Sequence, residues 1–208
     1  VLFRSRQPGD MIRALYGGSF DPVHAGHLAV IDTLLTRGLA AMVHVVPAGQ
    51  SPLKATPPRA SGADRLDLVR LALAGRERVL LDGREVRDGG VHYTVDTLAA
   101  LSREHPDDRW RLVVGADHVP QFARWREPER LLELAEVVVI ARGPVALEEP
   151  LTRRTMVVED FAHPAEATDL RRRLAAGDRP GPELMPPRVA DLIAARGLYG
   201  WPHPGEDA

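Results

Sequence analysis

A glycine-rich turn that joins a short apolar segment to a helix, at residues 15–28, constrains this chain more than any other segment. Residues 13–16 have the apolar pattern of a buried strand, and residues 29–35 have helical apolar spacing. Between them, Gly17 and Gly18 allow backbone conformations that are closed to larger residues. The start of a helix presents free N–H groups and the positive end of its dipole to an anion. The segment therefore predicts a phosphate-binding site.

Two histidines, His24 and His27, open the expected helix, and their spacing lets both face one ligand from the first turn. Each part also has a simpler interpretation, because a double glycine is often only a turn and a single histidine is often structural. A His-x-x-His pair can bind a metal as well. This pair lacks the glutamate of a zincin helix, and the chain has no cysteine to complete a zinc site. We therefore predict no protein-bound metal.

Length and composition limit the class of protein. The 208 residues suit a single domain at 11–200, and we expect a non-native or disordered leader at 1–10 and a frayed tail at 201–208. A net charge of −2 gives no basis for a broad nucleic-acid surface, and no apolar run is long enough to span a bilayer. Zero cysteines and no signal-peptide pattern favour a cytoplasmic protein. The sequence leaves the oligomeric state open, a homo-oligomer included.

Apolar, β-branched runs alternate with stretches of helical spacing along the chain. Strands are expected at 13–16, 42–46, 79–81, 111–114, 137–140 and 156–158. Helices are expected at 29–35, 64–74, 95–104, 129–134 and 188–195, the last one ending at Gly197. This alternation predicts an α/β fold: a doubly wound, mainly parallel sheet of five or six strands with helices on both faces.

Ligands of such sheets bind beyond the carboxyl ends of the strands. The glycine turn, residues 47–54 and residues 115–117 each follow a predicted strand, so we expect them to converge on one cleft. Residues 50–62 are rich in Pro, Ser and Ala without periodicity, which favours a mobile loop beside that cleft. Lys54, the only lysine of the chain, lies in this loop. A second loop is expected at 177–187.

Several segments together resemble a known family. The run from Gly17 to His27, Gly-Gly-Ser-Phe-Asp-Pro-Val-His-Ala-Gly-His, resembles the His-x-Gly-His signature of the nucleotidyltransferase superfamily, and its first half is similar to bacterial nicotinate-nucleotide adenylyltransferase. Further segments match that family in the same order: Val46-Pro47 with Pro52-Leu53-Lys54 (Leu53 in place of a histidine), 65–73, Tyr93 to Leu98, Gly115 to Asp117 with Trp125, and Gly197 to Tyr199. The resemblance implies a Rossmann-like nucleotidyltransferase fold.

The resemblance also implies that the cleft has two ends. Charge on the phosphates would be stabilised by His24, His27, Lys54 and Arg171. Contacts with ATP would come from Gly17, Gly18, Ser19, Phe20, Gly115, Asp117 and Thr168. The acceptor would bind at Tyr93, Thr94 and Trp125. Taken alone, Trp125 also fits a core aromatic, Asp117 a helix cap, and Tyr93 with Thr94 a helix start.

One segment departs from the family pattern. The second phosphate-binding signature of the superfamily reads roughly Ile-Ser-Ser-Thr-x-Ile-Arg, whereas residues 165–171 read Ala-Glu-Ala-Thr-Asp-Leu-Arg. Thr168 and Arg171 match, but Glu166 and Ala167 replace both serines, and Glu166 would repel phosphate unless turned away. In the alternative interpretation this is an ordinary helix with Thr168 as its N-cap.

The implied reaction is transfer of AMP from ATP to nicotinate mononucleotide, with Mg²⁺ bridging phosphate oxygens and with pyrophosphate as the second product. A phosphate nucleophile is already ionised at neutral pH, so no strong general base is required. An adenylyltransferase acting on phosphopantetheine or another acceptor is an alternative, which Trp125 and the segment at Tyr93 disfavour. A nucleotide-binding regulatory module without catalysis is a second alternative, which the change at Glu166 favours.

Overall fold

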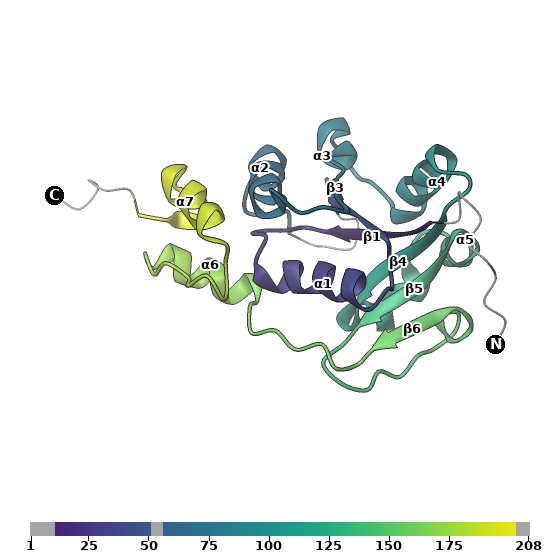
Figure 1. Ribbon diagram of the computed structural model, residues 1–208. Coiled ribbons are helices and arrows are strands. Elements are labelled where there is room, and N and C mark those ends of the chain that lie inside the picture. The colour runs from purple at the N-terminus through teal and green to yellow at the C-terminus, as the bar shows by residue number, and fades with distance from the viewer. Residues whose placement is uncertain (1–10, 51–55, 203–208) are drawn as a thin grey trace.

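A six-stranded parallel sheet forms the centre of the protein. The computed structural model describes residues 11–50 and 56–202 (Figure 1). The strand order is β3-β2-β1-β4-β5-β6, and every neighbouring pair is parallel. The strands are β1 (Ile12–Gly18), β2 (Met42–Pro47), β3 (Val79–Leu81), β4 (Arg109–Gly115), β5 (Ala135–Ile140) and β6 (Thr155–Val158). The predicted fold class is confirmed, with six strands.

The helices agree with the predicted periodicity to within a few residues. The α-helices are α1 (Ala25–Thr36), α2 (Gly62–Leu73), α3 (Arg84–Asp88), α4 (Thr94–Glu104), α5 (Pro128–Leu134), α6 (Ala167–Ala175) and α7 (Pro187–Ala195). The 3-10 helices are η1 (Ala116–Arg124), η2 (Leu151–Arg153) and η3 (Leu198–Gly200). The sequence did not predict α3 or the 3-10 helices, because they are too short or too irregular for an apolar period to develop.

Alternate side chains of the strands supply two separate cores, one on each face of the sheet. Ala14, Val43 and Val138 belong to the core that includes Leu34 of α1 and Leu68 of α2. The other core joins the neighbouring strand residues to α4 and α5, among them Leu15, Val46, Leu112, Leu98 and Leu131. Burial of both faces explains why the strand sequences are almost continuously apolar. The prediction of helices on both faces is confirmed.

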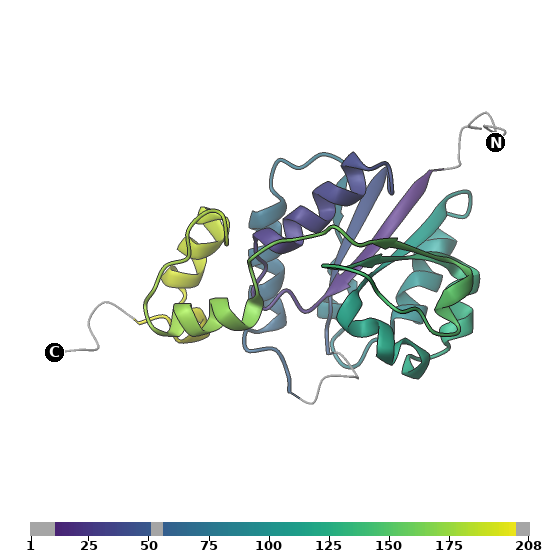
Figure 2. The same ribbon diagram turned by 90° about the horizontal axis from the view of Figure 1, so that it is seen from below.

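Helices α6 and α7 lie together beyond one end of the sheet, next to α2 (Figures 1 and 2). Arg196, the C-cap residue of α7, pairs with Asp64 (2.7 Å) and Asp67 (3.0 Å) of α2. Gly197 follows with a φ of 59°, a left-handed conformation that ends the helix as predicted. Burial and the nearby carboxylate of Asp21 raise the pKa of Tyr199, two residues on, and Arg171 of α6 donates to the carbonyl oxygen of Asp21. The C-terminal helices are therefore anchored to the loop that follows β1.

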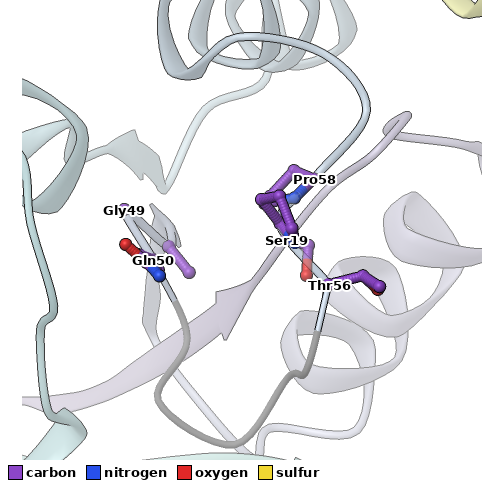
Figure 3. A pocket seen from close by; sticks show the side chains of 7 residues that line it. Ser19, Gly49, Gln50, Thr56 and Pro58 are labelled. Atoms are coloured by element: carbon purple, nitrogen blue, oxygen red, sulfur yellow. The ribbon is translucent and has the colours of Figure 1, made fainter.

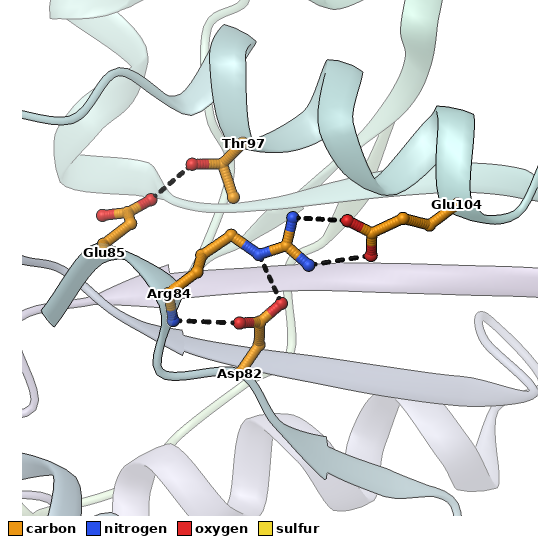
Figure 4. A network of polar contacts seen from close by, with 5 residues as sticks. All are labelled: Asp82, Arg84, Glu85, Thr97 and Glu104. Atoms are coloured by element: carbon orange, nitrogen blue, oxygen red, sulfur yellow. Dashed lines mark hydrogen bonds and ion pairs between the residues drawn. The ribbon is translucent and has the colours of Figure 1, made fainter. Parts of the chain in front are cut away.

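A polar network fixes α3 against α4 (Figure 4). The guanidinium of Arg84 donates to Asp82 (2.7 Å) and makes two bonds of 2.9 Å to Glu104 near the end of α4. The buried carboxylate of Glu85 accepts a hydrogen bond of 2.7 Å from the hydroxyl of Thr97, in the second turn of α4. Since these contacts bracket α4, they also fix where its first residues lie.

One buried histidine carries a pH-dependent contribution to stability. His44 of β2 is 4% exposed, and its Nε2 lies 3.1 Å from Nη1 of Arg13. An arginine nitrogen is always a donor, so Nε2 accepts and the ring is neutral. Burial and the charge of Arg13 lower the pKa of His44 to about 4.

We predict that His44→Gln reduces the acid sensitivity of folding. An unfolded histidine titrates near its ordinary pKa of about 6.5, so between that pH and about 4 the unfolded state binds a proton that the native state does not. Stability therefore falls as the pH falls through this window, and removing His44 removes its share. Urea denaturation at pH 7 and pH 5 should show that the free energy of unfolding falls less between these two pH values for the variant than for the wild type. An equal loss would show that His44 does not carry this proton linkage.

Candidate functional site

A cleft of about 1010 Å³ opens at the carboxyl ends of the central strands. The chain winds outward from β1 through β2 and β3, then crosses back to β4 and winds the other way through β5 and β6. Sheets of this kind bind ligands at such a reversal. The predicted site residues that line the cleft are Gly17, Gly18, Ser19, Phe20, His27, Tyr93, Thr94, Gly115, Asp117, Trp125 and Arg171. The expected convergence of strand-end segments is therefore confirmed.

The glycine-rich loop does not adopt the conformation that the sequence suggested. Gly17 and Gly18 are the last residues of β1, and neither has a positive φ; the left-handed residue is Phe20, with a φ of 48°. The prediction of unusual backbone angles at the two glycines is wrong. A Cβ on Gly17 would have no neighbouring atom closer than 4.0 Å, so the protein itself does not exclude a side chain there. Glycine instead leaves the backbone bare where it faces the cleft.

The two histidines stack on each other, with ring centroids 3.7 Å apart. The backbone N–H of His24 donates to Nδ1 of His27 over 3.1 Å, so a neutral His27 carries its proton on Nε2 as a donor. His27 lines the cleft, whereas His24 is 8% exposed and does not. Burial, with a smaller effect of His163, lowers the pKa of His24 to about 4, which keeps it neutral at pH 7.

Residues from distant helices hold the loop that follows β1. The carboxylate of Asp21 accepts from the backbone N–H groups of Arg59 (2.7 Å) and Ala60 (3.1 Å). Arg171 of α6 donates from Nη1 to the carbonyl oxygen of Asp21 over 2.6 Å, and from Nη2 to the hydroxyl of Thr168 over 3.1 Å. Thr168 is exposed and is not among the residues that line the cleft. Its hydroxyl orients Arg171, which does line it.

The opposite wall of the cleft is aromatic. Tyr93 is the N-cap residue of α4 and Thr94 its first residue, so both start a helix and also line the cleft. Trp125 follows η1 and packs 5.2 Å from the ring of Phe122, so it belongs partly to the core. The guanidinium of Arg126 lies 4.6 Å from the centroid of the Tyr93 ring. Flat aromatic faces beside a cation suit a planar, negatively charged ligand.

A small pocket lies between the loops that follow β1 and β2 (Figure 3). Gly49 and Gln50 form one side, and Ser19, Thr56 and Pro58 form the other. Residues 56–59 also line the main cleft, so this described part of the Pro-rich segment lies beside it as predicted. Lys54, predicted to act on phosphates, lies outside the described residues.

Comparison with known proteins supports a family assignment. Residues 15–173 match the model of the cytidylyltransferase-like family. The chain is 36% identical to the probable nicotinate-nucleotide adenylyltransferase of Rhodopirellula baltica, over 89% of this chain and 92% of that protein. It is 37% identical to the protein of the same name from Marinobacter nauticus, over 91% of this chain and 97% of that protein. The chain belongs to the nicotinate-nucleotide adenylyltransferase family.

A solved structure agrees with the fold. The nicotinic acid mononucleotide adenylyltransferase of Plasmodium falciparum, determined in complex with NaAD, superposes with a TM-score of 0.73 at 18% identity. The match covers 92% of this chain and 98% of that one. The Rossmann-like nucleotidyltransferase fold implied by the sequence is thus confirmed. Membership in the family makes the chain a nucleotidyltransferase.

At the start of α6 the structure explains how this family member accommodates its unusual sequence. The helix begins at Ala167 with Glu166 as its N-cap residue, so the alternative with Thr168 as the N-cap is wrong. Glu166 pairs with Arg142 over 3.1 Å, and Arg142 also donates to the carbonyl of His163 over 2.9 Å. This pairing offsets the negative charge that replaces a serine. Ala167 lines the cleft without a hydroxyl to offer.

Sequence reasoning did not identify several arginines at or near the site, among them Arg124 and Arg126 in the lining of the cleft. Arg142 follows β5, Arg59 lines the cleft, and Arg65 is buried within α2. The position of Arg142 just beyond a predicted strand end was a usable signal. Arg65 gave no signal beyond its place in a predicted helix, because only the fold shows that its side chain reaches the loops after β1 and β2. Within residues 11–50 and 56–202, no group of three or more His, Cys, Asp or Glu side chains could hold a metal ion, and no helix could cross a membrane.

Proposed function

We propose that this chain transfers AMP from ATP to nicotinate mononucleotide and so forms nicotinate adenine dinucleotide and pyrophosphate. One observation carries the proposal: a single cleft joins the glycine-rich segment and His27 to an aromatic wall, in a member of the nicotinate-nucleotide adenylyltransferase family. The residues that line this cleft include both the segment at the end of β1 and the aromatic wall. Such a cleft can hold both halves of a dinucleotide at once.

The end at β1 binds the phosphates of ATP. The bare backbone of Gly17 and Gly18 lets the phosphates approach closely, and the first turn of α1 adds the partial positive charge of a helix N-terminus. The N–H groups of His24 and Ala25 are already bonded, to Nδ1 of His27 and to the carbonyl oxygen of Leu184. His27 offers its Nε2–H, and Arg171 offers a fixed positive charge. His24 holds the ring of His27 by stacking. Asp117, Gly115 and Ser19 complete the contacts of this end.

The aromatic wall binds the acceptor. Trp125 stacks on the pyridine ring, and the main-chain N–H groups at Tyr93 and Thr94 receive the nicotinate carboxylate. An amide in place of the carboxylate has no need of an anion site. Contacts of this kind would favour nicotinate over nicotinamide mononucleotide.

The reaction is an in-line displacement that requires alignment more than acid–base chemistry. An oxygen of the acceptor phosphate bonds to the α-phosphorus of ATP, the bond to the bridging oxygen of the β-phosphate breaks, and that electron pair leaves with pyrophosphate. Mg²⁺ bound with ATP would supply positive charge against the negative charge of the phosphates. Among the described residues no group of three or more His, Cys, Asp or Glu side chains could hold it, so the substrates would have to supply most of its ligands. His27 and Arg171 stabilise the charge that develops on pyrophosphate.

The proposed function is tested by an assay of pyrophosphate release with ATP and Mg²⁺. We expect release with nicotinate mononucleotide, weaker release with nicotinamide mononucleotide, and none with phosphopantetheine. Preferred turnover of phosphopantetheine would favour a different acceptor. Binding of ATP with no release from any of the three would favour a regulatory module.

We predict that His27→Ala lowers kcat about 10²-fold, as loss of one preorganised donor commonly does, with the fold retained. His105→Ala is the control, because His105 lies at the far end of α4 near His44 and Trp110. Steady-state kinetics and far-UV circular dichroism measure the two properties. A folded His27→Ala protein with normal turnover would rule out this role.

We predict that substitutions at the two ends affect different substrates. Trp125→Ala should weaken nicotinate mononucleotide binding by about 1 to 3 kcal/mol with little change for ATP, and Trp125→Phe should retain most of the affinity. Arg171→Ala should raise the KM for ATP, whereas Arg172→Ala, whose side chain is exposed and paired with Asp169, should not. If Trp125→Ala and Arg171→Ala each weakened the use of ATP and of nicotinate mononucleotide to the same extent, the division of the cleft into two ends would be contradicted.

A further inference from the structure

The side chain of Arg65 lies buried beneath the two loops that border the cleft. It is only 2% exposed and does not line the cleft itself. Its Nη1 donates to the carbonyl oxygen of Ser19 over 2.7 Å, and its Nη2 donates to the carbonyl oxygen of Gly49 over 3.2 Å. One guanidinium therefore joins the loop after β1 to the loop after β2.

This position is costly for a charged group. Burial lowers the pKa of Arg65, the nearby Asp21 acts in the opposite direction, and Nε is buried without a partner among the described residues. Replacement of a buried charge by an apolar side chain of similar size is often neutral or stabilising. Stability alone is therefore a weak reason for a guanidinium here.

The contact at Gly49 continues to the acceptor segment. The N–H of Gln50 belongs to the same peptide unit as the carbonyl of Gly49, and it donates to the carbonyl oxygen of Gly90 over 3.2 Å. Gln50 also pairs with Val91 in a parallel bridge. Two residues later the chain reaches Tyr93 in the wall of the cleft. Main-chain and guanidinium hydrogen bonds thus connect the phosphate loop to the aromatic wall.

The junction leaves little room for adjustment. A Cβ on Gly49 would lie 2.6 Å from the carbonyl oxygen of Glu85 and 3.2 Å from that of Gly90. Glu85 is itself fixed to α4 through Thr97. A shift at Gly49 would therefore move the segment that carries the acceptor wall relative to Ser19.

We propose that Arg65 is a positioning residue that sets the separation of the phosphate loop and the acceptor segment, and so aligns the two reacting phosphates without touching either substrate. This inference rests on the proposed function of the two ends of the cleft. Because each substrate contacts only one end, each binds normally alone while the geometry of transfer depends on the link. A displacement of about 1 Å can slow such a reaction about 10²-fold.

The test uses the full chain with Arg65→Lys, which keeps the positive charge but cannot reach two carbonyl groups with a planar fork. We expect kcat to fall about 10-fold to 10²-fold, while calorimetric Kd values for ATP and for nicotinate mononucleotide, measured separately, change less than about threefold. Arg70→Lys is the control, because Arg70 lies on the exposed side of the same helix and pairs with Asp67. Its kcat should equal that of the wild type.

Gly49→Ala disturbs the same link from the other side and provides an independent variant if Arg65→Lys does not fold. We expect the same fall in kcat with both Kd values preserved. A normal kcat in either folded variant would overturn the inference. A loss of kcat that is no larger than the loss of folded protein would also overturn it. A Kd for one substrate that rises by the same factor as kcat falls would do so as well. Absence of dinucleotide formation by the wild type would refute the proposed function instead.

Discussion

The reversal of winding between β1 and β4 determines where everything else in this protein lies. Both strands are central and buried on both faces, so they cannot shift without disrupting two cores. The loops that leave their carboxyl ends diverge in opposite directions and cannot fill the space between them. That space becomes the cleft, with the end of β1 on one side and the segment after β4 on the other. The two-ended site is thus a consequence of strand order.

The loop after β1 gains its rigidity from helices that are distant in sequence. Phe20 and Val23 of this loop bury their side chains in the core, but its polar groups take their partners from elsewhere in the fold. Arg65 from α2 and Arg171 from α6 bind its carbonyl oxygens, and the backbone at Arg59 and Ala60 binds the Asp21 carboxylate. These bonds fix the loop through its carbonyl oxygens at Ser19 and Asp21 and through one carboxylate. The C-terminal helices therefore contribute to the site although they stand beyond the sheet.

Strand positions and most helices followed from apolar periodicity, and the boundaries of β3 were predicted correctly, because burial on both faces leaves a strong pattern. Reasoning from local sequence failed for residues whose position or conformation depends on tertiary contacts. Two equivalent histidines were expected, yet stacking places His27 at the cleft and His24 behind it. The positive φ belongs to Phe20 and not to the adjacent glycines. Arg65 reaches its partners across 46 and 16 residues of sequence, a separation that no local pattern encodes.

The central claim is that one cleft holds the ATP phosphates at β1 and the pyridine ring at the aromatic wall. A crystal structure of the protein with nicotinate adenine dinucleotide tests this most directly. The account predicts the adenylate half beside Gly17, Gly18 and His27, with the pyridine ring against Trp125 and its carboxylate near the N–H groups of Tyr93 and Thr94. A dinucleotide bound in the reverse direction, or outside this cleft, would contradict the account.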